Sequence, residues 1–170
     1  MSNIITYNQI LKVMEEIAKH HLQIKGFFVG KNWELNESNG KVNFPLLQVK
    51  PLSSNIVKSN QTKKFNTVQF SLYIRVLDRL DKGEANKSEV YSDTFQIIQD
   101  IVNLMSCHPY FKENLIELTT SVNLTPEEET VTEFAAGWST VLYIQIRNVN
   151  SYCGLPVKDW SDVNFPQNNL

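Results

Sequence analysis

Two long segments of the chain alternate apolar and polar side chains, which is the period of a β-strand with one buried face. The clearer one covers residues 65–80, and the other covers residues 138–147 with Trp138 first on its inward face. The small residues of Ala135-Ala-Gly-Trp138 are expected to form a tight turn into this last strand. Shorter apolar runs predict further strands at residues 27–29, 44–49 and 116–124.

Apolar residues at steps of three and four predict two helices. The first begins after Thr6, which fits a capping box with Gln9, and runs to about Leu22. The second covers residues 87–105 and ends before His108-Pro109, because proline disfavours helix in the residue that precedes it. A short turn of helix is expected at residues 110–115. The apolar stripe of the second helix is expected to consist of Tyr91, Phe95, Ile98, Val102 and Met105, with Thr94 and Ile101 beside it.

The segments between these elements are polar and have the composition of turns. Residues 50–64 (KPLSSNIVKSNQTKK) are expected to form a loop or an extended arm, and residues 125–129 (TPEEE) an acidic turn. The order of elements predicts an α+β fold, with an antiparallel sheet of about four to five strands and two main helices packed on one face. One domain is expected at residues 1–156, followed by a polar tail at residues 157–170.

Composition narrows the class of protein. The chain has 170 residues, of which 42% are hydrophobic, and a net charge of −2, as is typical of a soluble globular domain. This charge balance does not indicate a nucleic-acid-binding domain. The sequence shows no secretory signal and no apolar run long enough to span a membrane, so no membrane partner is expected. Cys107 and Cys153 are therefore expected to be free thiols.

Candidate chemistry is sparse. His20 and His21 are adjacent and would point about 100° apart on a helix, and no CxxC or HxxxH spacing occurs, so no metal site is predicted. No glycine-rich phosphate motif occurs either. We therefore expect no catalytic, cofactor-binding or metal-binding residues and no cofactor. An enzyme that uses Cys107 or His21 is retained as an alternative class.

Charge is distributed unevenly along the chain. Six positive residues and no negative ones lie within residues 41–77, and six glutamates without a positive residue lie within residues 113–146. These segments are either solvated loops or complementary patches of a head-to-tail assembly. The tail either folds back on the domain or binds a neighbouring subunit. The candidate subunit-interface residues are Lys58, Lys63, Lys64, Tyr73, Glu127, Glu128, Glu129, Trp160 and Phe165.

The order of elements and the C-terminal run TEFAAGWSTVLYIQIRNVNSYCGLP (residues 132–156) resemble a known family. They are similar to the tail terminator and tail-completion (neck ring) proteins of tailed bacteriophages, including crAss-like and related phages of Bacteroidetes. The Gly-Trp pair before a long strand and the closing Cys153-Gly-Leu-Pro156 carry the resemblance. It covers roughly residues 5–156.

The resemblance implies a structural virion protein and not an enzyme. Such a protein forms a homo-oligomeric ring at the head–tail junction or the tail terminus. The ring has sixfold symmetry more often than twelvefold symmetry. Its partners would be other neck, portal-adaptor or tail proteins, and DNA would pass through its lumen without sequence-specific binding. It would be assembled in the host cytoplasm and reside in the virion. A small non-catalytic interaction module or adaptor unrelated to phages is the alternative function.

Overall fold

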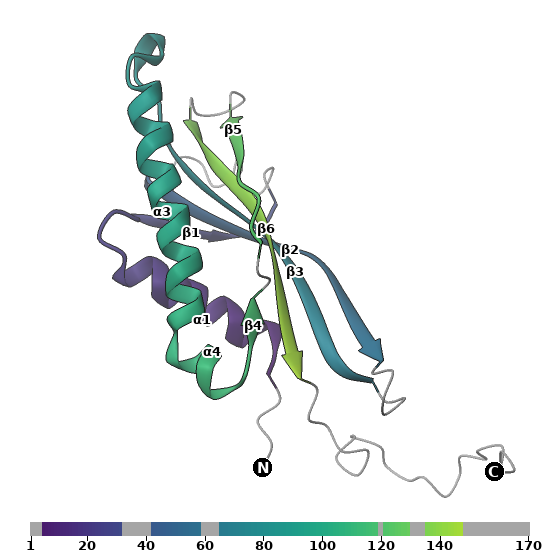
Figure 1. Ribbon diagram of the computed structural model, residues 1–170. Coiled ribbons are helices and arrows are strands. Elements are labelled where there is room, and N and C mark those ends of the chain that lie inside the picture. Colours follow the sequence, from purple (N-terminus) through teal and green to yellow (C-terminus); the bar gives the residue numbers. More distant parts are fainter. Residues whose placement is uncertain (1–4, 32–41, 59–64, 119–120, 130–134, 148–170) are drawn as a thin grey trace, which may run out of the picture.

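A six-stranded sheet with helices on one face forms the body of the protein (Figure 1). The computed structural model describes residues 5–31, 42–58, 65–118, 121–129 and 135–147. Along the chain the elements are α1 (Tyr7–His20), β1 (Gly26–Val29), β2 (Leu46–Lys58), β3 (Phe65–Arg79), the 3-10 helix η1 (Lys82–Glu84), α3 (Lys87–Cys107), α4 (Pro109–Glu113), β4 (Glu117–Leu118), β5 (Thr125–Glu129) and β6 (Ala135–Arg147).

The strand order is β1-β2-β3-β6-β4. Strand β5 pairs with the same edge of β6 as β4 does, but with an earlier part of β6. The predicted α+β class is confirmed. The prediction of four to five strands is too low, and the sheet is mixed instead of wholly antiparallel, because β1 runs parallel to β2.

Helix α1 begins as the sequence predicts. Thr6 accepts a hydrogen bond from the Gln9 backbone N–H, and the Gln9 side chain accepts one from the Thr6 backbone N–H at 2.7 Å, which completes the capping box. The helix ends at His20, and Leu22, which the prediction placed at its end, is 98% exposed. Its buried face consists of Ile10, Val13, Met14, Ile17 and Ala18.

Helix α3 packs against α1 and against strands β3 and β6, and its buried stripe differs in part from the predicted one. Phe95 is exposed, and Tyr91 is only partly buried. These two rings lie beside Trp138, with centroid distances of 5.9 Å for Tyr91 and 5.3 Å for Phe95. The stripe is shifted because the helix packs against α1 as well as the sheet. Its buried residues are Val90, Thr94, Ile97, Ile98, Ile101 and Met105.

The main core lies between these helices and one face of the sheet. In β3 that face carries Leu72, Ile74 and Val76, all with no exposed surface, as the alternating pattern predicts. The opposite face of β3 is less wet than the pattern indicates, because Arg75 is only 2% exposed. A charged side chain is therefore buried on the face that the helices do not cover.

Two predicted loops or turns and one predicted strand are wrong. Residues 50–58 continue strand β2 and pair with β3 across a register shift between Pro51 and Ser53. Residues 125–129 form β5 instead of an acidic turn, and only Glu117–Leu118 of the predicted strand at residues 116–124 is a strand. Pairing to β3 or β6 overrides the local composition in the first two cases.

The expected corner at Ala135-Ala-Gly-Trp138 is also wrong, because these residues are the first part of β6 and pair with both β3 and β5. Gly137 serves a different purpose there. A Cβ atom at this position would lie 1.9 Å from the carbonyl oxygen of Val76. Glycine therefore permits a close approach of the β3 and β6 backbones.

Candidate functional site

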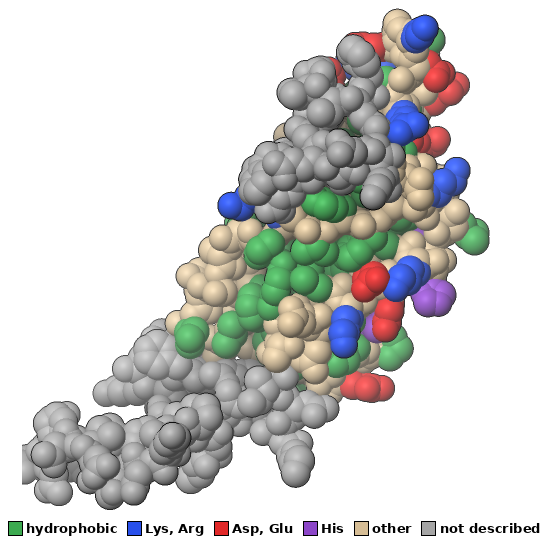
Figure 2. Space-filling view, turned by 180° about the vertical axis from the view of Figure 1, so that it is seen from behind, with side chains coloured by type: hydrophobic (Ala, Val, Ile, Leu, Met, Phe, Trp, Pro, Cys, Tyr) green, Lys and Arg blue, Asp and Glu red, His purple; other side chains and the backbone are tan. Residues whose placement is uncertain are grey.

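The sheet face that points away from α3 carries a group of interacting polar side chains. Figure 2 shows the molecule from behind, where hydrophobic side chains gather across the middle. The strand register places Gln48, Lys50, Tyr73, Arg75 and Ser139 on this face, because residues paired across antiparallel strands share a face. Glu127 joins them from β5 through its pairing with Gly137.

The Glu127 carboxylate lies at the centre of this network. It accepts a hydrogen bond from the Tyr73 hydroxyl and another from Ser139 Oγ at 2.7 Å. Arg75 Nη1 lies 3.5 Å from its second oxygen, and Arg75 Nε donates to Gln48 Oε1. The network therefore connects β2, β3, β5 and β6 across the sheet.

The environment of Tyr73 keeps its hydroxyl protonated. Burial, with the hydrogen bond to Glu127, raises the pKa of Tyr73 to about 12, although Ser139 and Arg75 act in the opposite direction. Lys50 Nζ lies 4.3 Å from the centroid of the Tyr73 ring, a cation–π contact. A neutral phenol that donates to a carboxylate is suited to holding the carboxylate in place. It is poorly suited to acting as a base near neutral pH.

Glu128 points to the opposite side of β5 and makes a second set of contacts. Lys87 Nζ lies 2.9 Å from its carboxylate, and Tyr91 donates a hydrogen bond to it at 3.0 Å. The hydrogen bond from Lys87 lowers the pKa of Glu128, with a further contribution from Tyr91. The Trp138 indole N–H donates to the backbone oxygen of Tyr91 at 2.9 Å. The start of α3 is therefore attached to β5 and β6.

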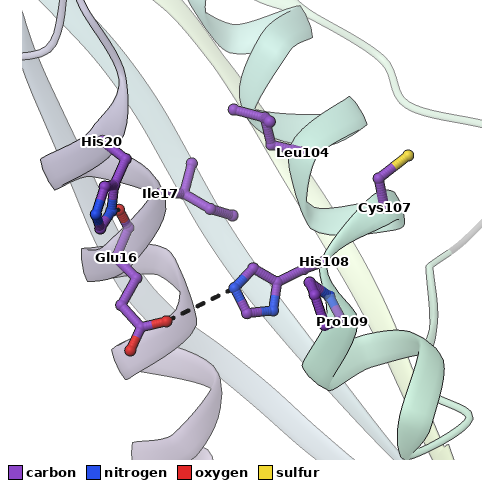
Figure 3. A pocket seen from close by; sticks show the side chains of 7 residues that line it. All are labelled: Glu16, Ile17, His20, Leu104, Cys107, His108 and Pro109. Carbon is purple, nitrogen blue, oxygen red and sulfur yellow. Dashed lines mark hydrogen bonds and ion pairs between the residues drawn. The ribbon is translucent and has the colours of Figure 1, made fainter.

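A third feature is a shallow, mostly apolar cleft of about 380 Å³ between α1 and the junction of α3 with α4 (Figure 3). His108 Nε2 lies 3.6 Å from the Glu16 carboxylate, and His20 Nδ1 lies 2.8 Å from the backbone oxygen of Glu16. The Cys107 sulfur points away from His108 in Figure 3. The arrangement therefore does not pair this thiol with the neighbouring imidazole for nucleophilic chemistry.

His21, the other reactive group considered from sequence, lies away from this cleft. Its Nε2 atom is 3.5 Å from Asp100, and its Nδ1 accepts a hydrogen bond from the Gln23 backbone N–H at 3.2 Å. Cys107 is an exposed free thiol. Among the described residues, no group of three His, Cys, Asp or Glu side chains is arranged to hold a metal ion, and no helix is long and apolar enough to cross a membrane.

The structure brings together only some of the candidate interface residues. Tyr73 and Glu127 contact one another, whereas Glu128 lies on the other face of the sheet. Lys58 and Glu129 end β2 and β5, and their side chains lie outside the described residues. The remaining candidates also lie outside the described residues: Lys63, Lys64, Trp160 and Phe165.

Sequence reasoning missed Arg75 and Gln48, which complete the Glu127 network. A signal for Arg75 was present, because it is the one charged residue within the alternating run from Val68 to Val76. A charge inside a strand of a packed sheet requires a partner when it is buried. The sequence did not indicate which partner, since the nearest carboxylates along the chain lie in other elements.

The chain was compared with protein-family models and with curated proteins, and neither comparison found a match.

Proposed function

We propose that this chain is the subunit of a homo-oligomeric ring in a tailed-bacteriophage virion, at the head–tail junction or the tail terminus. Rings of this kind have sixfold symmetry more often than twelvefold symmetry. The ring would join the portal or neck to the tail and surround the DNA passage. The proposal rests on the resemblance of residues 5–156 to tail terminator and neck ring proteins. The observation that supports it is the projection of the β2–β3 hairpin beyond the helices (Figure 1).

The projecting hairpin carries apolar side chains that the subunit itself does not cover. All residues from 51 to 56 are exposed, including Leu52 at 49% and Ile56 at 61%. Exposed apolar residues on a projecting element are typical of a surface that is buried in an assembly. A ring subunit needs such a surface, because each copy must bury part of itself against the next one.

The first test is the oligomeric state of the full-length chain. Mass photometry measures the mass of the particles in solution, and electron microscopy of negatively stained particles shows their shape. The expected result is a closed ring of six subunits. A second, matched pair of variants ties the ring to the hairpin. Ile56→Asp should abolish the ring and leave the far-UV circular dichroism unchanged. Leu22→Asp, at a residue that is 98% exposed but lies after α1, should leave the ring intact.

A chain that is monomeric at tens of micromolar would contradict the ring and favour the alternative, a small non-catalytic interaction module or adaptor. The position of the ring is tested separately. Mass spectrometry of purified phage particles should detect the chain in the virion, and labelling with a specific antibody should mark the neck or the tail end. A chain found only in the lysate and never in particles would contradict the virion assignment.

A further inference from the structure

Within the described chain, one long edge of the sheet is open. On the side away from β3, β2 pairs with β1 over residues 46–49 in the described chain, and the Gly30 N–H donates a hydrogen bond to the Val49 oxygen at 3.1 Å. From Lys50 to Lys58 no strand of the described chain lies on that side. Unpaired backbone N–H and C=O groups along such an edge are a template for another strand.

The opposite edge of the sheet is also open, at β5. This strand pairs with β6 over all five of its residues and has no strand on its outer side within the described chain. Pro126 is consistent with this position, since proline is tolerated on edge strands and not in central ones. Pro51 in β2 is likewise consistent with an edge position. Because proline has no N–H to donate, the part of the β2 edge that can pair with another strand is residues 53–58.

The two edges are compatible in direction. Strand β2 is antiparallel to β3, β3 to β6, and β6 to β5, so β2 and β5 of one subunit run in opposite directions. If β5 of a second copy continued the sheet past β2 with its helices on the same side, the new pair would be antiparallel. Antiparallel pairs are the commoner kind.

Charge also favours this pairing over a symmetric one. Residues 50–58 contain two lysines and no acid, whereas β5 contains three glutamates. A symmetric pairing of two β2 strands centred on Ser54 would place Lys50 opposite Lys58 of the second copy at both ends, which is unfavourable. Because Arg75 and Lys87 already lie beside two of the glutamates, charge selects the partner more than it adds affinity.

From these observations we infer that the open edge of β2 binds β5 of a second copy of this chain, forming an antiparallel strand pair that repeats head to tail. The inference deepens the proposed ring, on which it rests, by naming the two surfaces that meet. Backbone hydrogen bonds over five or six residues would supply the contact, and Leu52 and Ile56 would become covered at the joint.

The geometry of this joint has a consequence for the shape of the assembly. Within a subunit, β5 lies level with Leu46 and Gln48 of β2, as the register through β6 and β3 shows. The usable part of the open edge begins only at Ser53, so each copy must be displaced along the strand direction relative to the last. A constant displacement of this kind tilts the strands, and tilted strands are what a closed barrel requires.

The test uses disulfide cross-linking between two full-length variants, both with Cys107→Ser and Cys153→Ser. One carries Asn55→Cys in β2 and the other carries Thr125→Cys in β5; both sites are exposed, and the strand register puts both side chains on the sheet face of Arg75. Mixed under mild oxidation, the two should yield a disulfide-linked dimer on non-reducing gels, and neither should do so alone. Ser92→Cys, at an exposed site on α3, replaces Asn55→Cys as the control and should yield no dimer.

Each outcome bears on a different claim. Rings without the mixed cross-link would overturn the strand pairing and leave the proposed ring standing. A mixed cross-link in open chains that never close would support the pairing and contradict the ring. Dimers of Asn55→Cys with itself would show a symmetric β2 contact and overturn the inference. A protein that stays monomeric and uncross-linked would overturn both.

Discussion

Replacement of Gly137 by alanine tests the close approach of β3 and β6. The new Cβ would lie 1.9 Å from the Val76 oxygen and 3.1 Å from the Leu77 Cα, where ordinary contact begins at 3.4 Å. These neighbours are backbone atoms of a central strand, so no side chain can rotate away to relieve the clash. The two strands must separate locally by about 1.5 Å, the difference between 1.9 and 3.4 Å.

The cost of this separation has two parts. Overpacking of a buried site costs about 1–3 kcal/mol, and each backbone hydrogen bond that is weakened costs about 1 kcal/mol. We therefore expect Gly137→Ala to lower the free energy of unfolding by about 3 kcal/mol. For a chain of this length that corresponds to a fall in Tm of about 6–12 °C.

The assay is urea unfolding followed by far-UV circular dichroism, together with a thermal scan. Gly83→Ala is the control, because it adds the same methyl group where nothing lies within 4 Å and only the positive φ of 75° opposes it. That conformation costs an alanine about 1 kcal/mol. If Gly137→Ala were no less stable than Gly83→Ala, the close approach of the two strands would be refuted.

Three further predictions follow from the described contacts. Thr6→Ala removes the capping box of α1 and should lower the free energy of unfolding by about 1 kcal/mol in urea titrations. Trp138→Phe removes the indole hydrogen bond to the Tyr91 oxygen and should cost about 1–2 kcal/mol by the same method; an unchanged midpoint would contradict that bond. In a pH titration at 295 nm, with Tyr73→Phe subtracted, Tyr73 should ionise near its raised pKa of about 12, and Glu127→Gln should lower that midpoint. Because the folded pKa lies above the ordinary value of 10.0, stability should fall as the pH rises from 10 to 12.

The elements with strong local patterns were predictable from the sequence. The capping box at Thr6, the period-two alternation of β3 and the His108-Pro109 helix end depend on residues near one another in the chain. Strand β5 was not predictable in this way, because TPEEE has the composition of a turn and is extended only where the edge of β6 supplies a partner. The same holds for residues 50–58, which are polar and extended because β3 pairs with them.

The candidate site was predictable only in part for the same reason. Tyr73 and Glu127 were both selected from sequence, one as an exposed aromatic on a polar face and the other as part of an acidic run. Their contact joins residues that are 54 positions apart, and neither local pattern contains that information. Arg75, the buried cation beside them, was overlooked because an arginine on the polar face of a strand is ordinarily solvated.

The use of both faces of β5 limits how this strand could serve an assembly. Glu127 is bound on one face by Tyr73 and Ser139, and Glu128 is bound on the other by Lys87 and Tyr91. An intersubunit salt bridge to either carboxylate would compete with contacts that already hold β5 to the rest of the subunit. The outer backbone edge of β5 is not committed in this way within the described chain. Of the ways in which the acidic segment could contact a neighbour, strand pairing is therefore the one that leaves the subunit's own contacts in place.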